Sequence, residues 1–238
     1  MWKPGELWGV EMPYLSRSQI ESIADQVINQ YKQLYVPQKR LCYSINPFEL
    51  AAMLELSVDF QILSDDCTIL GMTSPGEVCV TLFDDNMDEI IYYMDGSTIL
   101  LEKRLLLNPW NKGKLNFTLT HEIGHQIVYR MYPEEYGADC RTISSYKRKS
   151  RPHAKITDWE EWQADTFAAA LLLPEDAIRD AMFFFGLGER MKLLSKKYSE
   201  NNYNRFCEMA EFLNASRSAL AFRMEQLGLL DNNKLIPT

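Results

Sequence analysis

Apolar residues recur at helical spacing in the first part of the chain. They follow the capping-box pattern Ser18-Gln19-Ile20-Glu21 and occupy Ile20, Ile23, Val27, Tyr31 and Leu34. Side chains three or four residues apart share one face of an α-helix, so the pattern predicts an amphipathic helix over about 18–34. Asn46-Pro47-Phe48-Glu49 then combines a capping residue, a proline at the first helical position and an acid in the first turn. This predicts a second helix, which we expect to end near Leu56.

The spacing changes from helical to alternating after this helix. Apolar and polar residues alternate in Val58-Asp59-Phe60-Gln61-Ile62, as in a half-buried strand. Further runs predict strands at about 67–72, 77–83, 89–94 and 98–102, with Ser74-Pro75-Gly76 and Asp95-Gly96 as turns between them. We expect these strands to form a small, mostly antiparallel sheet. The strand near 89–102 is our candidate edge, to which an extended peptide could add as a further strand.

Helical spacing returns in the rest of the chain. One apolar face runs from Phe117 to Val128, and a second helical stretch runs from Trp159 to the residue before Pro174. Beyond Pro174 we expect more helices, with the apolar run 182–185 as an anchor in the core. The order of elements predicts an α+β protein. We divide it into a domain over 1–174, in which N-terminal helices and the small sheet pack on the two central helices, and a helical C-terminal subdomain over 175–238.

The last two predicted helices, at 204–213 and 216–227, resemble the helix pair of a helix-turn-helix. The positive charges of these helices are balanced by acids. The arginines are Arg205, Arg217 and Arg223, and the three glutamates are Glu208, Glu211 and Glu225. A helix that reads DNA needs surplus positive charge, whereas the whole chain carries a net charge of −8. We therefore interpret this tail as a packing or protein-binding unit and expect no direct contact with nucleic acid.

Composition indicates a globular protein without a membrane segment. The 238 residues are 46% hydrophobic and 12% aromatic, which is enough for a substantial core. No apolar run approaches the roughly 18 residues of a membrane span, and the start of the chain lacks an apolar signal core. The cysteines are odd in number and follow no metal-site spacing, as in reduced cytosolic proteins: Cys42, Cys67, Cys79, Cys140 and Cys207. We therefore expect a cytoplasmic protein.

A metal-binding motif lies in the first central helix, where the chain reads H-E-x-x-H from His121 to His125. Residues four apart lie one above the other on a helix, so the imidazoles of His121 and His125 can bind one ion. Neutral imidazole is a good ligand for Zn²⁺, and we expect one zinc ion here. Glu122 can then act as general base towards a water molecule on the metal and return the proton to a leaving amine.

Two unrelated histidines on a surface helix are the alternative, and they fit the sequence less well. The chain has only three histidines, and two of them stand four apart with a glutamate between them. Gly124 is a further sign, because a glycine costs a helix interior roughly 1 kcal/mol relative to alanine and needs a reason. Close approach of a neighbouring element beside the metal is such a reason. A purely structural zinc site is disfavoured because it has no use for Glu122.

The third protein ligand of a catalytic zinc is expected in the second central helix. Glu161 shares one face there with Ala164, Asp165 and Ala168, so two carboxylates stand one turn apart among small residues. Such a face can pack closely against the Gly124 side of the first helix. Glu161 would then reach the metal, while Asp165 would accept a hydrogen bond from the outward nitrogen of a ligand histidine. The alternative is a core helix with two solvated acids.

Basic residues dominate the stretch between the two central helices, where residues 132–156 show no regular periodicity. The basic side chains are Arg141, Lys147, Arg148, Lys149, Arg151, His153 and Lys155. One interpretation is a solvated, mobile loop. The other is a basic lid that attracts an acidic substrate segment against the negative charge of the body. His153 is also a candidate to stabilise the developing oxyanion, or to take the place of Glu161 as third ligand.

At the two central helices the sequence resembles the ImmA/IrrE-type metallo-endopeptidases. The resemblance rests on F-T-L-x-H-E-x-G-H at Phe117–His125 and on E-x-x-A-(N/D)-x-F-A-A-x-L-L-x-P at Glu161–Pro174. It implies a gluzincin-like site with the two histidines and Glu161 as ligands and Glu122 as base. Gln163 departs from the family, whose members often have glutamate there, but Glu161 occupies the ligand position.

Together these features predict a cytoplasmic, zinc-dependent endopeptidase whose peptidase domain covers 1–174. The resemblance also implies the partner, because relatives of this type act on helix-turn-helix transcription repressors. Some relatives carry a DNA-binding domain before the peptidase core, for which the roughly 45 residues before the second helix leave little room. We therefore expect a separate regulator, cut once in an exposed segment between its domains. The alternative is a metal-containing binding protein that sequesters a transcription regulator without cutting it.

Overall fold

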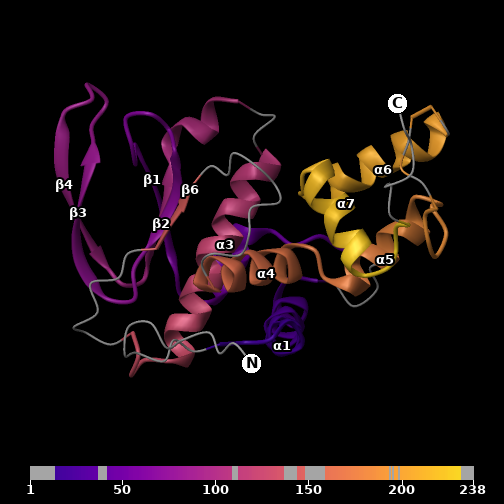
Figure 1. Cartoon of the computed structure of the whole chain (residues 1–238), viewed down its shortest axis with the longest axis horizontal. Helices are drawn as coiled ribbons and strands as arrows, with labels where there is room; N and C mark the ends of the chain where they lie inside the picture. The colour runs from indigo at the N-terminus through magenta and orange to yellow at the C-terminus, as the bar shows by residue number, and fades with distance from the viewer. Residues whose placement is uncertain are drawn as a thin grey trace, which may run out of the picture.

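The computed structural model describes residues 14–36, 42–108, 112–136, 144–147, 159–192, 194, 196–197 and 199–231. The strands in these ranges are β1 (Ser57–Gln61), β2 (Ile69–Thr73), β3 (Glu77–Phe83), β4 (Glu89–Asp95), β5 (Thr98–Glu102) and β6 (Ser144–Lys147). The helices are α1 (Arg17–Tyr35), α2 (Pro47–Met53), α3 (Lys112–Met131), α4 (Trp159–Leu172), α5 (Glu175–Phe184), α6 (Glu200–Phe212) and α7 (Arg217–Gln226), with the 3-10 helix η1 (Lys103–Leu107) after β5. Helices and strands lie in separate parts of the molecule (Figure 1), so the α+β prediction is confirmed.

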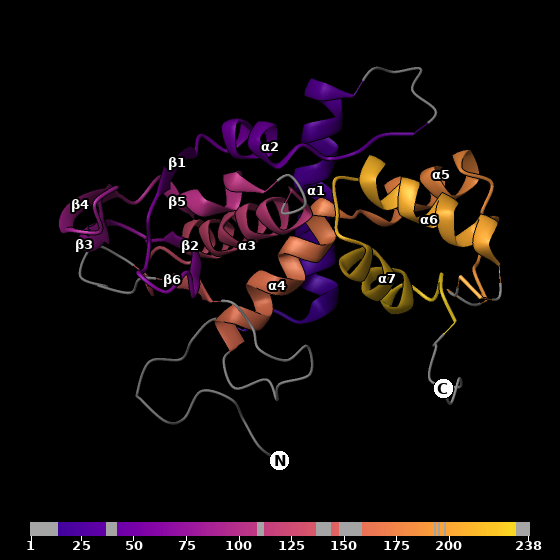
Figure 2. The same ribbon diagram turned by 90° about the horizontal axis from the view of Figure 1, so that it is seen from above.

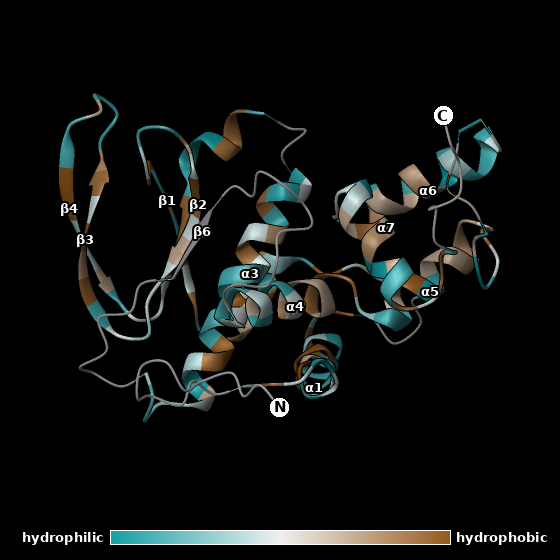
Figure 3. Cartoon of the chain, viewed as in Figure 1, coloured by the Kyte–Doolittle hydropathy of each residue, from teal (hydrophilic) through white to brown (hydrophobic). Residues whose placement is uncertain are grey.

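The first helix, α1, covers the region that the sequence predicts. Its capping box starts at Ser16 rather than Ser18, because the side chain of Gln19 accepts from the amide of Ser16 at 2.9 Å and the Ser16 hydroxyl accepts from the amide of Gln19. Its buried face consists of Ile20, Ala24, Ile28 and Tyr31. Hydrophobic and hydrophilic segments lie side by side around α1 in Figure 3, as expected of an amphipathic helix.

The second helix, α2, begins where the sequence predicts but ends earlier. Asn46 caps it, with Oδ1 3.1 Å from the amide nitrogen of Phe48. The predicted extension to Leu56 is wrong because Glu55 takes a left-handed conformation with a φ of 56°. The amide of Leu56 then donates to the carbonyl of Ala51 at 2.9 Å. This bond satisfies one of the last helical carbonyls, and the chain turns into β1.

The strands form two sheets rather than the single one expected. β1, β5, β2 and β6 make a four-stranded sheet in that order, in which β1 and β5 are parallel and the other pairs antiparallel. β3 and β4 make a separate antiparallel ribbon. Because β5 lies between β1 and β2, the prediction that the region 89–102 supplies a free edge is wrong for residues 98–102. Alternation predicts a strand from local sequence, but its neighbours depend on distant residues.

The four-stranded sheet lies between the ribbon and the helices. Along β5, Ile99 and Leu101 belong to the large core shared with the helices, whereas Leu100 belongs to a smaller core shared with the ribbon. The ribbon contributes Leu82 and Met94 to that smaller core. Figure 1 shows the resulting layers, with the ribbon at one end of the molecule, the four-stranded sheet next to it and α3 beyond the sheet.

The last three helices lie together at the end of the molecule opposite the ribbon (Figure 2). The large core continues into them from α3 and α4. In α7 the buried guanidinium of Arg223 donates to the carboxylate of Glu21 in α1 at 2.8 Å and to the carbonyl of Leu173 at 3.2 Å. The tail is thus a packing unit; its role in binding proteins and the division of the chain at residue 174 stay predictions. None of the helices in the described ranges is long and apolar enough to cross a membrane.

The aromatic run in α5 serves only in part as an anchor. Met182 is buried in the large core. Phe183 is 85% exposed and Phe184 is 57% exposed, because both lie on the side of α5 that points away from its buried face. The prediction that the whole run lies in the core is therefore wrong for these two residues.

A strand lies inside the basic stretch for which we expected no regular structure. Residues 144–147 form β6, which contains Lys147 and pairs with β2. The other basic residues of the stretch lie outside the described residues: Arg141, Arg148, Lys149, Arg151, His153 and Lys155. The basic lid and the two possible roles of His153 therefore stay predictions.

Candidate metal centre

Helix α3 brings His121 and His125 together inside the protein. His121 is 0% exposed and His125 is 2% exposed, and their Nε2 atoms lie 3.1 Å apart. Almost every residue from Leu115 to Tyr129 is buried, because β2, β5 and α4 all pack on α3. The four-residue spacing places both rings on the same face of the helix, so their nitrogens point towards one place.

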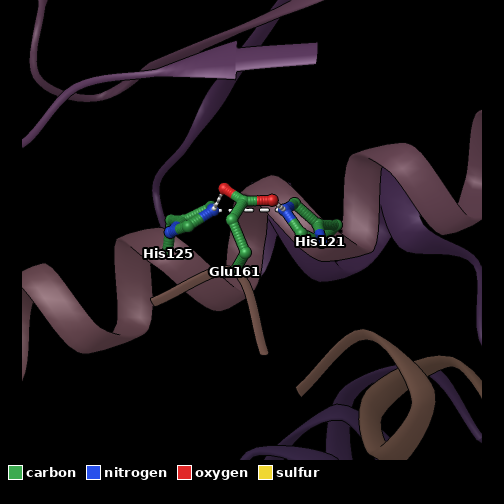
Figure 4. Close-up of side chains that lie close together, drawn as sticks. All are labelled: His121, His125 and Glu161. Carbon is green, nitrogen blue, oxygen red and sulfur yellow. Dashed lines mark hydrogen bonds and ion pairs between the residues drawn. The ribbon is translucent and has the colours of Figure 1, made fainter. Parts of the chain in front are cut away.

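Glu161 completes the cluster from α4. Its Oε1 lies 3.3 Å from Nε2 of His125, and its Oε2 lies 3.4 Å from Nε2 of His121. Figure 4 shows the carboxylate between the two rings, which project from α3. One ligand atom from each of the three residues lies within 4.8 Å of the other two. The structure therefore gathers the three residues that the sequence nominates as ligands.

The close approach of α3 and α4 depends on Gly124. A Cβ atom at this position would lie 2.9 Å from Cβ of Phe167 and 3.3 Å from Cα of Ala164, both in α4. A carbon–carbon distance of 2.9 Å is well inside the optimum of about 3.5–4.0 Å. The glycine thus has the reason that the sequence predicts, which is tight packing of a neighbouring helix beside the cluster.

Asp165 lies one turn after Glu161 and contacts the other side of the His121 ring. Its Oδ1 is 3.0 Å from Nδ1 of His121. A carboxylate accepts from an N–H group, so Nδ1 carries a hydrogen on this side of the ring and Nε2 is the nitrogen that faces the cluster. The contact is the one that the sequence predicts, while its effect on a bound metal stays a prediction.

Burial and hydrogen bonding act in opposite directions on the charges of the cluster. Burial lowers the pKa of His121, but hydrogen bonds to Asp165 and Glu161 and the nearby charge of Glu122 outweigh it and raise the pKa to about 9. Burial raises the pKa of Glu161, but hydrogen bonds from His121 and His125 outweigh it and hold the pKa well below its usual range. Glu161 is therefore ionised at neutral pH and available as an anionic ligand.

The donor set fits a zinc ion. Two nitrogens about 2.05 Å from a tetrahedral ion lie about 3.3 Å apart, and a nitrogen and an oxygen lie about 3.4 Å apart. The corresponding separations in the cluster are 3.1, 3.3 and 3.4 Å. Two imidazoles and one carboxylate leave a fourth position for water or substrate, as in catalytic rather than structural zinc sites.

Contacts that were not identified from the sequence tie the site to β2 and the residue after it. Gln126 donates from Nε2 to Oγ1 of Thr73 at 2.7 Å and to the carbonyl of Ser74 at 2.8 Å. Glu122 is fully buried on the side of α3 that faces Gly71 of β2. These contacts join segments about 50 residues apart, which local periodicity does not reveal. A glycine within a strand pattern is the one available signal, since it often marks a close approach of another element.

A hollow of about 660 Å³ opens along the last turns of α3. Gln126, Tyr129 and Tyr136 line part of it. The Tyr129 ring stacks on the imidazole of His125, with ring centroids 5.9 Å apart. Tyr129 thus contacts both the hollow and His125, and the hollow is large enough for side chains of a bound peptide.

Comparison with known proteins identifies the family. The peptidase M78 model, described as the IrrE N-terminal-like domain, matches residues 77–225. The match covers more than half of the chain and includes both α3 and α4. The chain belongs to this family. A search of curated proteins gives no match to it.

Membership of the M78 family confirms the resemblance seen at the two central helices. The family assignment supports a peptidase, and the cluster of His121, His125 and Glu161 suggests a bound metal ion. The matched region begins at β3 and ends in α7, so it includes the ribbon as well as most of the last three helices.

Proposed function

We propose that this M78 chain is a zinc-dependent endopeptidase of the cytoplasm. The observation that carries the proposal is the convergence of two histidines and a carboxylate from α3 and α4, next to the buried Glu122. When bound, a divalent ion supplies Lewis-acid chemistry, because it polarises a carbonyl and lowers the pKa of water.

The chain's own residues account for the other requirements of peptide hydrolysis. His121, His125 and Glu161 would hold the ion, and Asp165, which accepts from Nδ1 of His121, would orient Nε2 as the nitrogen that binds it. Glu122 takes a proton from the attacking water and later gives it to the leaving amine. The burial of His121, Glu122 and His125 keeps bulk water from these side chains and strengthens their electrostatic interactions.

We infer that the substrate is a helix-turn-helix transcription repressor that is supplied as a separate protein. The support is the family resemblance together with the charge pattern, in which a basic stretch at 141–155 stands out from a chain of net charge −8. That stretch would attract an acidic, exposed segment between the domains of the repressor. The hollow along the last turns of α3 would accept side chains of this segment.

Removal and return of the metal test the proposal. Dialysis against a chelator should abolish cleavage of the repressor, and one equivalent of zinc per chain should restore it. Cleavage at an undiminished rate in metal-free protein would contradict the proposal. Mass spectrometry of the repressor separates an enzyme from a protein that only sequesters it, because sequestration leaves the repressor chain whole.

A further inference from the structure

Gly71 of β2 lies directly against the carboxylate of Glu122. A Cβ atom at position 71 would be 2.7 Å from Oε1 and 3.0 Å from Cγ of Glu122, and 2.8 Å from Cγ2 of Thr118. Thr118 and Glu122 stand one turn apart on the same face of α3, and both are 0% exposed. The space that any other residue would fill at position 71 is thus the space in which the Glu122 carboxylate lies.

An irregularity in β2 turns Gly71 towards α3. The pairing of β2 with β6 shifts register between Ile69 and Gly71, which leaves Leu70 as the extra residue of a bulge. Leu70 belongs to the large core on the helix side, while Ile69 and Met72 contact the smaller core on the ribbon side. Leu70 and Gly71 therefore both face the helices, although neighbouring residues of a regular strand face opposite sides.

A larger residue at this position would meet the buried side chain of Glu122. Its side chain is enclosed by β2 on one side and by the body of α3 on the other, and it is fully buried. An added methyl group would therefore displace the carboxylate. The three atoms nearest to that methyl group include none from His121, His125 or Glu161.

We propose that Gly71 is a positioning residue for the general base. It leaves open the volume that sets where the Glu122 carboxylate stands relative to the three-residue cluster. This inference rests on the proposed function, because it assigns Gly71 a purpose only if Glu122 acts as the base. It concerns the rate of the chemical step, since the contact involves the base and none of the three metal-binding residues.

A packing role for Gly71 is the competing explanation, because the methyl group of Thr118 is almost as close as the carboxylate. Two substitutions separate the explanations. Thr118→Ser removes Cγ2 and keeps the hydroxyl. In the native protein this hydroxyl donates to the carbonyl of Lys114 at 2.9 Å, and serine can keep the same hydrogen bond. Glu122→Asp withdraws the carboxylate from β2 and leaves Thr118 unchanged.

The experiment compares Gly71→Ala, Thr118→Ser and their double variant in zinc content, Tm, kcat and KM for the repressor. We expect every variant to bind one zinc per chain and the cobalt-substituted forms to keep the same visible spectrum. Gly71→Ala should lower kcat by about 100-fold with little change in KM, because a displacement near 1 Å can cost that much. Adding Thr118→Ser should recover Tm and leave kcat low, while Thr118→Ser alone should keep the native kcat.

A cycle with Glu122→Asp completes the test. Gly71→Ala should cost less than about tenfold in kcat in the Glu122→Asp background, since contacting residues are not additive. Recovery of kcat together with Tm in the Gly71→Ala/Thr118→Ser variant would overturn the inference in favour of packing. Loss of zinc from both Gly71→Ala variants, or an undiminished kcat in Gly71→Ala, would overturn it as well. Glu122→Gln distinguishes these failures from failure of the proposed function, because that variant is inactive only if Glu122 is the base.

Discussion

At the scale of single residues, the chemistry of the candidate site depends on which atoms carry hydrogens. Asp165 accepts the Nδ1 hydrogen of His121, so the ring is oriented with Nε2 towards the cluster. Glu161 remains ionised because hydrogen bonds from both histidines outweigh its burial. The same contacts would lower the reorganisation needed on metal binding.

Asp165→Ala should therefore weaken zinc binding by about 10–100-fold, as expected for loss of the hydrogen-bond partner of a ligand histidine. Asp165→Asn should cost less, because its amide oxygen can still accept from Nδ1 of His121. Competition with a chromophoric chelator measures both affinities. Asp180→Ala, in α5, serves as a control that removes an acid outside the cluster. Native affinity in Asp165→Ala would show that the contact has no part in holding the metal.

At the scale of elements, the site depends on how closely α3 approaches its neighbours. Two glycines set these distances, Gly124 towards α4 and Gly71 towards β2. The sequence reveals the first because a glycine inside a helical pattern needs a reason, and the acids of α4 stand on a face of small residues. The second emerges only from the structure, because it depends on the bulge in β2 and on pairing with β6.

Gly124→Ala should destabilise the fold even though alanine is the better helix former. The added methyl group meets Phe167 and Ala164, and overpacking of this kind costs about 1–3 kcal/mol in free energy of unfolding. Urea denaturation of the metal-free protein measures the change. Gly76→Ala is the matched control, because a Cβ there would meet no atom within 4 Å. Equal stability of the two variants would argue against a tight α3–α4 contact.

The end of β5 provides a pH-dependent contribution to stability. Glu102 is 1% exposed and accepts from the amide of Leu63 and the side chain of Arg104. Burial raises the pKa of Glu102, but these hydrogen bonds outweigh it and lower the pKa. Because the folded pKa lies below the unfolded value of about 4.3, the stabilisation is present above that value and is lost as pH falls through the folded pKa.

Glu102→Gln should therefore lower the free energy of unfolding at pH 7 by about 1–3 kcal/mol, and the difference from the native protein should shrink in acid. Urea denaturation at pH 7 and near pH 3.5 tests both statements. Glu208→Gln, at an exposed position of α6, should leave stability unchanged at either pH. A loss in Glu102→Gln that is equal at both pH values would contradict the assigned cause.

At the scale of the whole molecule, local patterns predicted the elements better than their arrangement. Helix caps and alternation located α1 and most strands, because both depend on neighbouring residues. The separate ribbon, the interior place of β5 and the strand at 144–147 were missed, because each depends on partners far along the chain. The residues of the metal site could be predicted from the sequence because H-E-x-x-H and the face that carries Glu161 each lie within one helix.

Specificity belongs to this scale because the proposal involves both the basic stretch and the hollow along the last turns of α3. Neutralising Lys147, Arg148, Lys149 and Arg151 should slow cleavage of a neighbouring helix-turn-helix repressor, and added salt should do the same, because exposed charges are screened within about 8–10 Å. The matched control neutralises Lys196 and Lys197, which lie between α5 and α6. Unstructured casein should be cut poorly by all forms. Rapid digestion of casein, or insensitivity to neutralisation, would remove this account of specificity.

The central claim, that this M78 chain hydrolyses a peptide bond with Glu122 as base, is tested most directly by Glu122→Gln. The measurement is zinc content and repressor cleavage on the same preparation. The substitution keeps the size of the side chain and all three metal-binding residues but removes the base. We predict one zinc per chain and a fall in cleavage rate of at least about 100-fold, as expected for loss of general-base catalysis. A Glu122→Gln protein that keeps its zinc and cuts the repressor at the native rate would contradict the account.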